Sequence, residues 1–549
     1  MGWFYRCVPW KAVTRIKFGW PLGVVRRMIR KRRVENGMND DEKERSPEDD
    51  QSEETSSSSS EQSDSEQGPS TMNELRSACI RAFRAAVAAV QPYERVRDAL
   101  RVNGCQLTVG KRVYQLQHNV HVAAIGKAAL GMVQGAEASL GKEIVEGIAS
   151  VPRMTIKKIP PESHMITEFY EGATNNLPDE DACINAERIE NMARRLRDPN
   201  DIFLVLLSGG GSALLPAPVN SISLADKLAT IKAMTARGAD IKQLNCVRRA
   251  LSRLKGGKLA EIAHPAKIIA VIVSDIVGDP IDLIASGPTV IEHYSMLSEN
   301  PTKVLKKLHA WEVIPPNVQQ ALQRASATRP ANAKVDVQNT IICNNETAIK
   351  GVSKTLEGSG YSCHIASTTV AQDATLFGEQ LAGLINSILG GMKPEDALRN
   401  LDMTCIDVNC PDDDRLALLF GGETTVTLTG KGKGGRNQQI VLSALSKLLE
   451  DPDTEIKGEF ALLSAGTDGQ DGPTDAAGAV LTSDDIKYIH DNGRWEKGDV
   501  DGFLRKNDSF NFWKVFRDGV CHVNTGPTGT NVMDVQVLLI NKKVNIFTL

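Results

Sequence analysis

The amino-acid sequence predicts an α/β protein with two domains, and two observations predict that class. From Met72 onward, apolar runs of strand length alternate with helical patterns. Several of these runs are almost continuously apolar, which indicates a parallel sheet covered on both faces. Ligands bind beyond the carboxyl ends of the strands in such sheets, so we expect the chemistry in the loops that follow the strands.

Five predicted strands are each followed by a glycine-rich or polar loop and then by a helix. In chain order they are His121–Ile125, Ile202–Leu207, Ile268–Val273, Thr340–Cys343 and Phe460–Leu463. The first N–H groups of a helix have no partner within the helix and suit anions. The five loops are therefore the candidate binding segments.

The first 71 residues differ in composition from the rest, and we expect them to be a disordered extension. Residues 1–33 carry ten Lys or Arg and no acid, whereas residues 35–70 carry thirteen acids and two bases and are rich in serine. The acidic segment has too little apolar surface to form a core. We expect one domain over 72–330 and a second over 331–549, joined near the Ala- and Pro-rich segment 326–337.

The bulk composition excludes several classes of protein. A formal net charge of −4 gives no basic field for nucleic acid, and no apolar run is long enough to span a bilayer. Ten cysteines without a metal-ligand spacing indicate free thiols. We expect a cytoplasmic protein, with mitochondrial targeting by the basic head as the alternative, although Pro9 and Pro21 interrupt a helix there.

The stretch SGGGSALLPAP at 208–218 is the most informative local motif. Three consecutive glycines let the backbone approach a ligand closely, whereas a plain strand-to-helix turn needs only one. We predict that this loop binds a phosphate or a carboxylate and that the next helix begins near Ser223. The predicted binding residues are Ser208, Gly209, Gly210, Gly211 and Ser212.

A second glycine-rich loop, GKGKGGRNQ at 430–438, precedes an amphipathic helix. Lys431, Lys433 and Arg436 stand near the helix N-terminus, where basic residues oppose the helix dipole unless an anion is bound. Anion binding is therefore the prediction, and a hairpin-like loop is the alternative. Gly434, Gly435 and Asn437 are the further binding residues predicted here.

A third basic stretch, LSRLKGGK at 251–258, leaves two interpretations open. It lacks the leading Gly and the final Ser or Thr of a P-loop. Lys255 and the arginines at 248, 249 and 253 form either a solvated face or part of a substrate pocket, and Gly256-Gly257 suits a helix C-cap. Lys255 is included among the predicted binding residues.

Aspartates after two of the predicted strands offer oxygen ligands for a hard cation. Asp275 follows the strand 268–273, while Asp468, Asp471 and Asp475 share the stretch SAGTDGQDGPTDAAGA at 464–479. Mg²⁺ prefers oxygen ligands and commonly shares them with substrate phosphates, so Asp275 and Asp471 are predicted metal ligands. Glycine-rich loops, acids and isolated bases together suit phosphoryl transfer.

These motifs, in this order, resemble the glycerate kinase family whose C-terminal half is the MOFRL domain. The resemblance covers Met72 to the C-terminus and excludes the first 71 residues. Beyond the stretches quoted above, it rests on IGKAALGM (125–132), GATNNLPDEDA (172–182), SDIVGDPIDLIASGPT (274–289), FGGETTVTLT (420–429) and NTGPTGTNVMDV (524–535).

The resemblance implies ATP-dependent phosphorylation of D-glycerate with a divalent cation such as Mg²⁺. It implies a cleft between a Rossmann-like N-terminal domain and the α/β MOFRL domain. The family's proposed catalytic residues, the lysine of GKA, the arginine of GRNQ and the aspartate of GTDG, fall on Lys127, Arg436 and Asp468. Thr467 stands beside Asp468 as a predicted binding residue. The sequence departs from the expected family pattern at Gln439, where Glu is expected, and at Met533, where a polar residue is expected.

The chemistry of Lys127, Arg436 and Asp468 suggests a different role for each residue. Lys127 would neutralise phosphate oxygens, and Arg436 would hold a carboxylate or the γ-phosphate through a bidentate contact. Asp468 would act as a base or help to position Mg²⁺. Three alternatives stay open: a kinase for another small sugar acid, an inactive binding protein on the same fold, and phosphorylation at either the 2- or the 3-hydroxyl.

Overall fold

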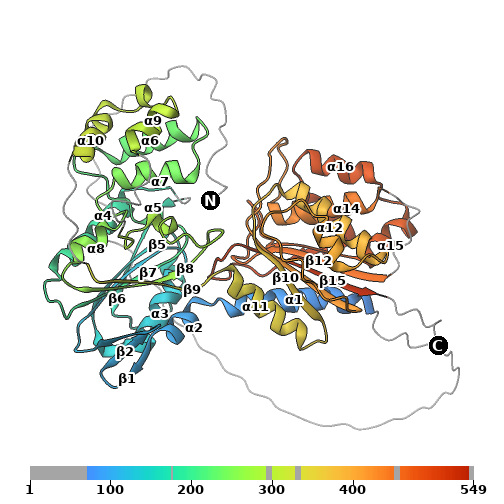
Figure 1. The fold of residues 1–549 in the computed structure, drawn as a ribbon, viewed down its shortest axis with the longest axis horizontal. Coiled ribbons are helices and arrows are strands. Elements are labelled where there is room, and N and C mark those ends of the chain that lie inside the picture. The colour runs from blue at the N-terminus through green and yellow to red at the C-terminus, as the bar shows by residue number, and fades with distance from the viewer. Residues whose placement is uncertain (1–70, 175–176, 292–299, 328–334, 451–457, 543–549) are drawn as a thin grey trace, which may run out of the picture. The chain divides into compact units, whose positions relative to one another are not determined.

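The computed structural model describes residues 71–174, 177–291, 300–327, 335–450 and 458–542 (Figure 1). The predictions made for residues 1–70, both the disordered extension and the targeting alternative, lie outside the described residues, as does most of the predicted linker at 326–337. None of the described helices is both long and apolar enough to cross a membrane.

The first sheet has six parallel strands in the order β6-β5-β4-β7-β8-β9. Their bounds are β4 Val120–Ile125, β5 Ile144–Pro152, β6 Thr167–Gly172, β7 Ile202–Leu207, β8 Lys267–Val273 and β9 Val337–Cys343. The first four strands predicted from the sequence correspond to β4, β7, β8 and β9. The predicted parallel sheet is confirmed here. The sequences of its strands are almost continuously apolar because helices cover both faces of the sheet.

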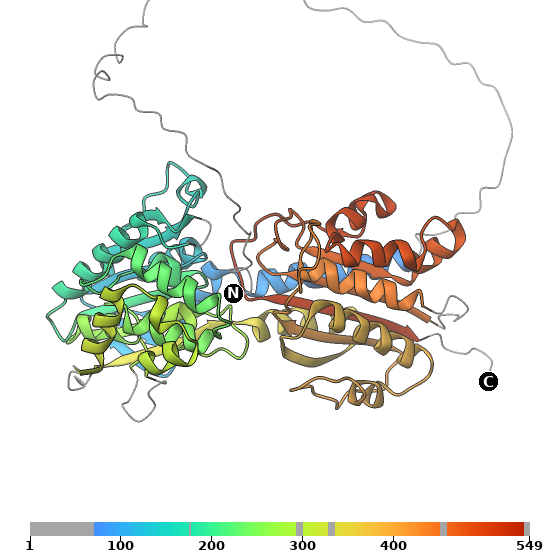
Figure 2. The same cartoon turned by 90° about the horizontal axis from the view of Figure 1, so that it is seen from above.

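Alternate residues of each strand face opposite helical layers. On β4, Val122 and Ala124 pack into the cluster that holds α2 (Pro92–Ala99) and α3 (Ala129–Leu140). Ala123 and Ile125 face the other way, toward α4 (Glu180–Arg195), α5 (Gly211–Leu214) and α8 (Lys258–Ala263) (Figures 1 and 2). Both faces of the sheet are therefore buried, and the loops at its carboxyl end remain for ligands.

Two smaller units accompany the first sheet. Helices α6 (Leu224–Thr235), α7 (Ile241–Ala250), α9 (Pro301–Lys307) and α10 (Pro316–Ala327) share a separate apolar cluster. Ser223 forms a capping box with Asp226 at the start of α6, where a helix start is predicted. The one-turn helix α5 precedes it, however, so the first helix after β7 begins earlier than predicted, at Gly211. Strands β1 (Arg101–Asn103), β2 (Gln106–Val109) and β3 (Arg112–Gln115) form a small antiparallel sheet.

The second sheet has six strands in the order β10-β11-β15-β12-β13-β14 and is mixed rather than parallel. Among the described strands of this sheet, only β10 and β11 pair in parallel; β15 is antiparallel to both β11 and β12. Their bounds are β10 Ser362–Val370, β11 Arg415–Gly422, β12 Gly458–Gly466, β13 Gly478–Thr482, β14 His522–Val523 and β15 Asp534–Lys542. The parallel assignment of Phe460–Leu463 was wrong, because two covered faces make a strand apolar whatever its direction.

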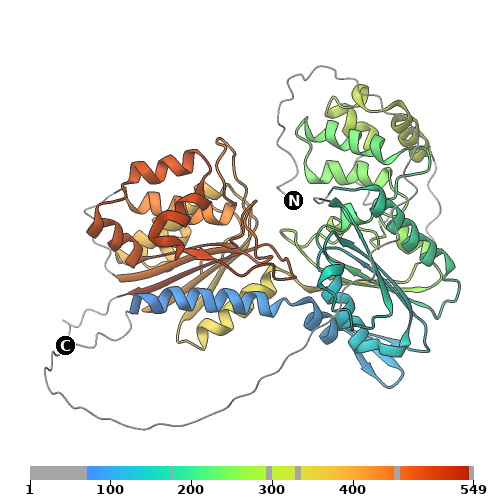
Figure 3. The same ribbon diagram turned by 180° about the vertical axis from the view of Figure 1, so that it is seen from behind.

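Helices cover both faces of the second sheet. On one face α1 (Thr71–Ala89) lies along β12, β13 and β15 beside α11 (Asn345–Glu357), as Figure 3 shows. On the other face α12 (Ala374–Leu389) packs against α14 (Arg436–Leu448). The remaining helices of this half are α13 Pro394–Arg399, α15 Ser483–Asn492, α16 Lys497–Arg505 and α17 Ser509–Val515.

The chain divides between the two sheets differently from the predicted boundary near residue 330. Strand β9, at 337–343, pairs with β8 and completes the first sheet. Helix α1, at 71–89, packs on the second sheet although it begins the described chain. Sequence position alone does not reveal this exchange, because it depends on which apolar face each element covers.

Candidate active site

The loops after β4 and β7 are joined by backbone hydrogen bonds at the carboxyl end of the first sheet. Lys127 N donates to Gly209 O at 2.9 Å, and Ala128 N donates to Ser208 Oγ at 3.1 Å. Since β4 and β7 are neighbouring parallel strands, these bonds extend their pairing into the loops. Two segments separated by about eighty residues of sequence thus become one surface.

Each glycine of the 209–211 run faces another part of the protein. A Cβ at Gly209 would lie 2.0 Å from Asp275 Oδ2, and one at Gly210 would lie 3.3 Å from Lys127 Cγ. Gly210 also has φ 79°, a left-handed conformation that glycine adopts without strain. The glycines therefore let Asp275 and Lys127 approach the loop from both sides. The predicted approach of a ligand to the same loop stays a prediction.

In the second half of the chain, Arg436 forms ion pairs that connect α14 to β11 and β15. It is the first residue of α14, and its Nη2 donates to Asp534 Oδ1 at 2.8 Å while Nε donates to the other oxygen of that carboxylate. Its Nη1 lies 3.2 Å from Glu423 Oε1, just after β11. Although burial opposes it, Asp534 and then Glu423 raise the pKa of Arg436, so the guanidinium stays charged.

This geometry changes the part predicted for Arg436. A bidentate contact with a substrate needs one edge of the guanidinium, and Asp534 occupies the edge formed by Nε and Nη2. Asp534 itself is fully buried. Arg436 therefore holds two carboxylates in place at the ends of β11 and β15.

Asp468 lies at the end of β12 and shares its surroundings with Asp534. Oxygens of the two carboxylates lie 3.2 and 3.3 Å from the position a Cβ would take on Gly466. Burial, together with the charge of Asp534, raises the pKa of Asp468 above its ordinary value, although the Gln470 N–H opposes the shift. A carboxyl group with a raised pKa accepts a proton more readily, as a general base must.

Lys127 connects the groups of the two sheets electrostatically. Its side chain is exposed, and its charge lowers the pKa of both Asp468 and Asp275 against the opposing effect of burial. Burial raises the pKa of Asp275 overall, and the charge of Glu423 adds to that rise. Lys127, Asp275 and Asp468 are thus brought together, as the sequence predicts for a phosphate site with acids around it.

The donor set around these residues fits a hard cation. Asp275, Glu423 and Asp468 supply carboxylate oxygens, the ligands that Mg²⁺ takes in proteins. Within the described ranges no three His, Cys, Asp or Glu side chains converge closely enough to hold a metal alone. Mg²⁺ commonly binds through one or two carboxylates and completes its shell with substrate phosphates, so this sparse set is compatible with it.

Asp471, predicted as a metal ligand, has four protein donors instead. Its Oδ1 accepts from Asn437 N at 3.0 Å and its Oδ2 from Gln438 N at 2.9 Å, and the side-chain amides of both residues add bonds at 3.3 and 3.0 Å. The side chain is 1% exposed. Asp471 therefore caps the first turn of α14, and its lone pairs are used for that purpose.

The glycines of the loop 430–435 pack closely against other backbone segments. A Cβ at Gly430 would lie 2.2 Å from Lys506 O, one at Gly432 would lie 2.4 Å from Asp508 Cβ, and one at Gly435 would lie 2.2 Å from Asp471 Cγ. Close packing thus accounts for these glycines without a ligand. Lys431 and Lys433 remain exposed, and the Lys433 ammonium lies 4.1 Å from the centre of the Phe510 ring.

Several other predicted binding residues also have protein partners. Ser212 Oγ pairs with Ser286 Oγ at 2.7 Å, and Thr467 Oγ1 donates to Met533 O at 2.6 Å. Asn437 is fully buried and accepts from Ser464 Oγ at 2.6 Å. Gly256 and Gly257, considered as a C-cap, stand before α8 instead, with Gly257 in its N-cap position. These residues build the walls of the site rather than its open surface.

Sequence reasoning missed Glu423 and Asp534 as site residues. Both lie in stretches that carry the family resemblance, and each had a signal of its own. Glu423 directly follows Gly421-Gly422 at the end of an apolar strand, and Asp534 interrupts the apolar run 532–540. An acid in an apolar strand needs a partner when buried, and that requirement points to an arginine.

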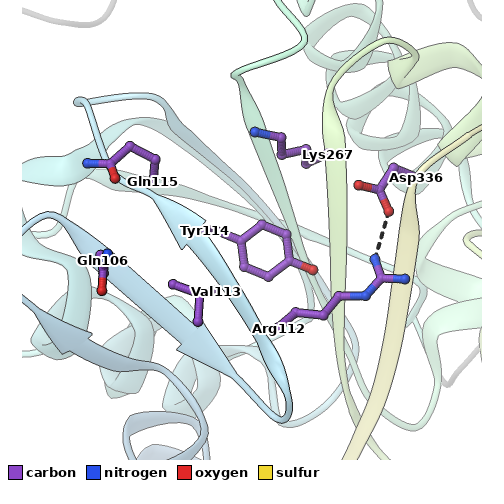
Figure 4. A pocket seen from close by; sticks show the side chains of 7 residues that line it. All are labelled: Gln106, Arg112, Val113, Tyr114, Gln115, Lys267 and Asp336. Carbon is purple, nitrogen blue, oxygen red and sulfur yellow. Dashed lines mark hydrogen bonds and ion pairs between the residues drawn. The ribbon is translucent and has the colours of Figure 1, made fainter.

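A hollow of about 690 Å³ lies elsewhere, between the small antiparallel sheet and the amino ends of β8 and β9. Tyr114 and the ion pair between Arg112 and Asp336, at 2.7 Å, line it (Figure 4). Lys267 begins β8, so this hollow lies at the end of the sheet opposite to the loops of Lys127 and Asp275. It contains none of the predicted site residues.

Known protein families and relatives match most of this chain. A profile described as "Domain of unknown function (DUF4147)" matches residues 78–323, and the profile of the MOFRL family matches residues 416–534. A glycerate kinase of Danio rerio is 38% identical over 505 residues, covering 85% of this chain and 98% of the relative. The chain belongs to the glycerate kinase family.

Two further members extend the comparison to prokaryotes. A glycerate 2-kinase of Pyrococcus horikoshii is 32% identical over 478 residues, covering 86% of this chain and 98% of that protein. The crystal structure of a glycerate kinase from Thermotoga maritima superposes with a TM-score of 0.69 at 31% identity, over 85% of this chain and all of that one. The resemblance inferred from the motifs is thus confirmed over nearly the same span.

Proposed function

We propose that this protein transfers the γ-phosphoryl group of ATP to D-glycerate and forms 2-phosphoglycerate. The observation that carries the proposal is the meeting of Lys127, Asp275 and Asp468 in one glycerate kinase fold. Both the zebrafish relative and the Thermotoga structure are named glycerate kinase. The name glycerate 2-kinase given to the Pyrococcus relative supports the 2-hydroxyl as acceptor.

The residues suit the charge changes of the reaction. The acceptor hydroxyl oxygen attacks the γ-phosphorus, the bond from that phosphorus to the β–γ bridging oxygen breaks, and ADP leaves. Asp468, whose pKa is raised by burial, accepts the hydroxyl proton. Lys127 is exposed at the loop junction and neutralises charge on the transferring phosphoryl oxygens.

Mg²⁺ would be held by Asp275, with Glu423 nearby, and would supply positive charge to the phosphates of ATP. Arg436 does not contact substrate in this scheme. Through its ion pairs it fixes Asp534 and Glu423, and so fixes the carboxylate wall against which Asp468 lies.

A coupled assay of ADP release with ATP, Mg²⁺ and D-glycerate tests the proposal. Glycerate-dependent ADP release is the expected result. Release only with other small sugar acids would replace the substrate, and no release with any of them would indicate a binding protein on the same fold. ³¹P NMR of the product then distinguishes 2-phosphoglycerate from 3-phosphoglycerate.

A further inference from the structure

A group of cationic and amide side chains lies buried or half-buried beside the 208–212 loop, and the reaction described above does not use it. We call it the α6–α7 cluster. It consists of Lys227 on α6, Asn245 and Arg248 on α7, and Lys255, which follows α7.

Lys227 is the unusual member of the cluster. Its residue is only 6% exposed, and its Nζ has no hydrogen-bond partner within the part of the chain that the structure describes. Burial lowers the pKa of Lys227 to about 7; the thiol of Cys183 opposes this shift, and the cation Arg248 adds to it. An unpaired buried ammonium is costly, so it calls for an anion.

Asn245 presents a second unused donor. Its Oδ1 accepts from Ser286 Oγ at 3.0 Å and lies 3.4 Å from Arg248 Nη1. Because arginine only donates, the atom facing it must be the amide oxygen, which fixes the orientation of the amide. The Nδ2 group then points away from both, and it too is buried without a partner among the described residues.

The cluster is continuous with the candidate active site. Lys255 Nζ donates to Ser212 O at 3.1 Å and to Ala285 O at 3.3 Å. Ser212 Oγ pairs with Ser286 Oγ, the group that also binds Asn245. Two residues before Ser212, Gly210 faces the Lys127 side chain. A small molecule whose hydroxyl reached Lys127 and Asp275 would therefore extend toward the α6–α7 cluster.

We propose that the α6–α7 cluster binds the carboxylate of the acceptor substrate, with Lys227 Nζ and Asn245 Nδ2 as the donors. This inference rests on the proposed phosphorylation of glycerate and adds the subsite that distinguishes a sugar acid from an uncharged alcohol. Arg248 and Ser286 position Asn245, and Lys255 positions the loop.

A carboxylate fits this cluster better than the phosphates of ATP do. Lys227 and Lys255 are 6% and 1% exposed, and burial of this degree disfavours a large polyanion such as a triphosphate. Lys127, in contrast, is exposed and accessible to a triphosphate from solvent. The two anionic groups of the reaction would thus be held by two separate sets of cations.

The test compares the full-length wild type with Lys227→Met, a variant that keeps the length of the side chain and removes its charge. The matched control is Lys232→Met, which changes an exposed lysine on the same helix. Each protein is assayed for the KM of D-glycerate, the KM of ATP and kcat, and D-glycerate binding without ATP is measured by calorimetry. Thermal unfolding reports whether each variant is folded.

We expect Lys227→Met to raise the KM and the dissociation constant of D-glycerate by about tenfold to a hundredfold, the effect of one lost charged hydrogen bond. The KM of ATP should stay unchanged. The melting temperature without ligand should not fall, because Met removes a buried amine that has no partner among the described residues. Asn245→Leu should act in the same direction. With D-glyceramide, which lacks the carboxylate charge, the variant and the wild type should differ far less.

Two results would overturn the subsite. A rise in the KM of ATP with D-glycerate binding unchanged would assign the cluster to the nucleotide, and no change in any constant would leave Lys227 as a buried structural amine. A wild type without glycerate-dependent turnover or binding would overturn the proposed function itself, and the subsite with it. An active wild type beside an unaffected variant overturns the subsite alone.

Discussion

The guanidinium of Arg436 donates two hydrogen bonds to the carboxylate of Asp534. Nη2 donates to Oδ1 at 2.8 Å, and Nε donates to Oδ2. Asp534 is fully buried, and it begins the central β15 strand of the second sheet, whereas Arg436 begins α14. The pair therefore fixes the start of a helix to the start of a strand. Removing one partner leaves the other charge buried without compensation.

Asp534→Ala should therefore lower the free energy of unfolding by about 3–5 kcal/mol, as expected for one half of a buried ion pair. Urea denaturation measures the change. Glu346→Ala is the control, because its pair with Lys350, at 2.7 Å, is exposed and should contribute less than about 1 kcal/mol. Equal effects of the two substitutions would show that the Arg436–Asp534 pair is not an internal clamp.

Lys127→Met should lower kcat by about a hundredfold to a thousandfold, the range seen when a charge that stabilises the transition state is removed. The melting temperature should stay within about a degree of the wild type, since the side chain is exposed. Lys142→Met removes another exposed lysine, in the short turn at 141–143, and serves as the control. Near-normal turnover by a folded Lys127→Met protein would contradict the role of Lys127 in neutralising charge on the transferring phosphoryl group.

Asp468 should set the acidic limb of the pH–rate profile. Because a general base works only when deprotonated, and because burial raises the pKa of Asp468 above 3.8, activity should rise with pH at a position above that ordinary value. Asp468→Asn should abolish that limb together with most of the turnover. A residual activity that kept the same acidic limb would show that another group accepts the proton.

Asp471 should make stability depend on pH. Burial raises the pKa of Asp471 from 3.8 to about 6 in the folded protein, so folding takes up a proton between these values. The stabilising contribution of this titration is complete below pH 3.8 and is lost as the pH rises through 6. It should amount to roughly 3 kcal/mol, from about two pKa units at about 1.4 kcal/mol each.

The measurement for Asp471 compares the wild type with Asp471→Asn by urea denaturation at several pH values. The wild type should lose stability relative to the variant as the pH rises from about 4 to about 7. A difference that does not depend on pH would mean that Asp471 titrates normally. Since Asn also caps helices, the comparison removes the titration while keeping an acceptor for the first turn of α14.

The positions of the strands that end at the site were predicted correctly from the sequence, whereas the side-chain contacts between the loops that follow them were not. The strand predictions at β4, β7 and β8 hold because an apolar run that ends at a glycine-rich or polar loop is a local signal. The partners of Arg436 come from residues about 13 positions before it and 98 after it, and no local pattern joins them. Asp471 shows the same limit. A carboxylate beside glycines is expected both for a helix cap and for a metal ligand, so the sequence pattern alone does not distinguish the two roles.

The mixed second sheet illustrates a different limit. Strand direction is set by the connections and by which helices cover each face, while the hydrophobic pattern reports only burial. Phe460–Leu463 is buried by α1 on one side and α14 on the other, and its neighbours β13 and β15 both run antiparallel to it. The Lys227 amine was missed for a related reason, since a lysine on an amphipathic helix usually faces solvent.

Two glycine-to-alanine substitutions should differ in their effects. One should lower activity, because its glycine lies against a site residue, and the other should raise stability without changing activity. Gly209→Ala places a methyl group 2.0 Å from Asp275 Oδ2, so the carboxylate must move and activity should fall sharply. Gly383→Ala lies inside α12 with no atom within 4 Å of the new methyl group. It should raise the free energy of unfolding by about 0.5–1 kcal/mol through helix propensity, with kcat unchanged. Steady-state kinetics and urea denaturation of both variants check the pair. Full activity in Gly209→Ala would mean that Asp275 does not need its place beside the loop.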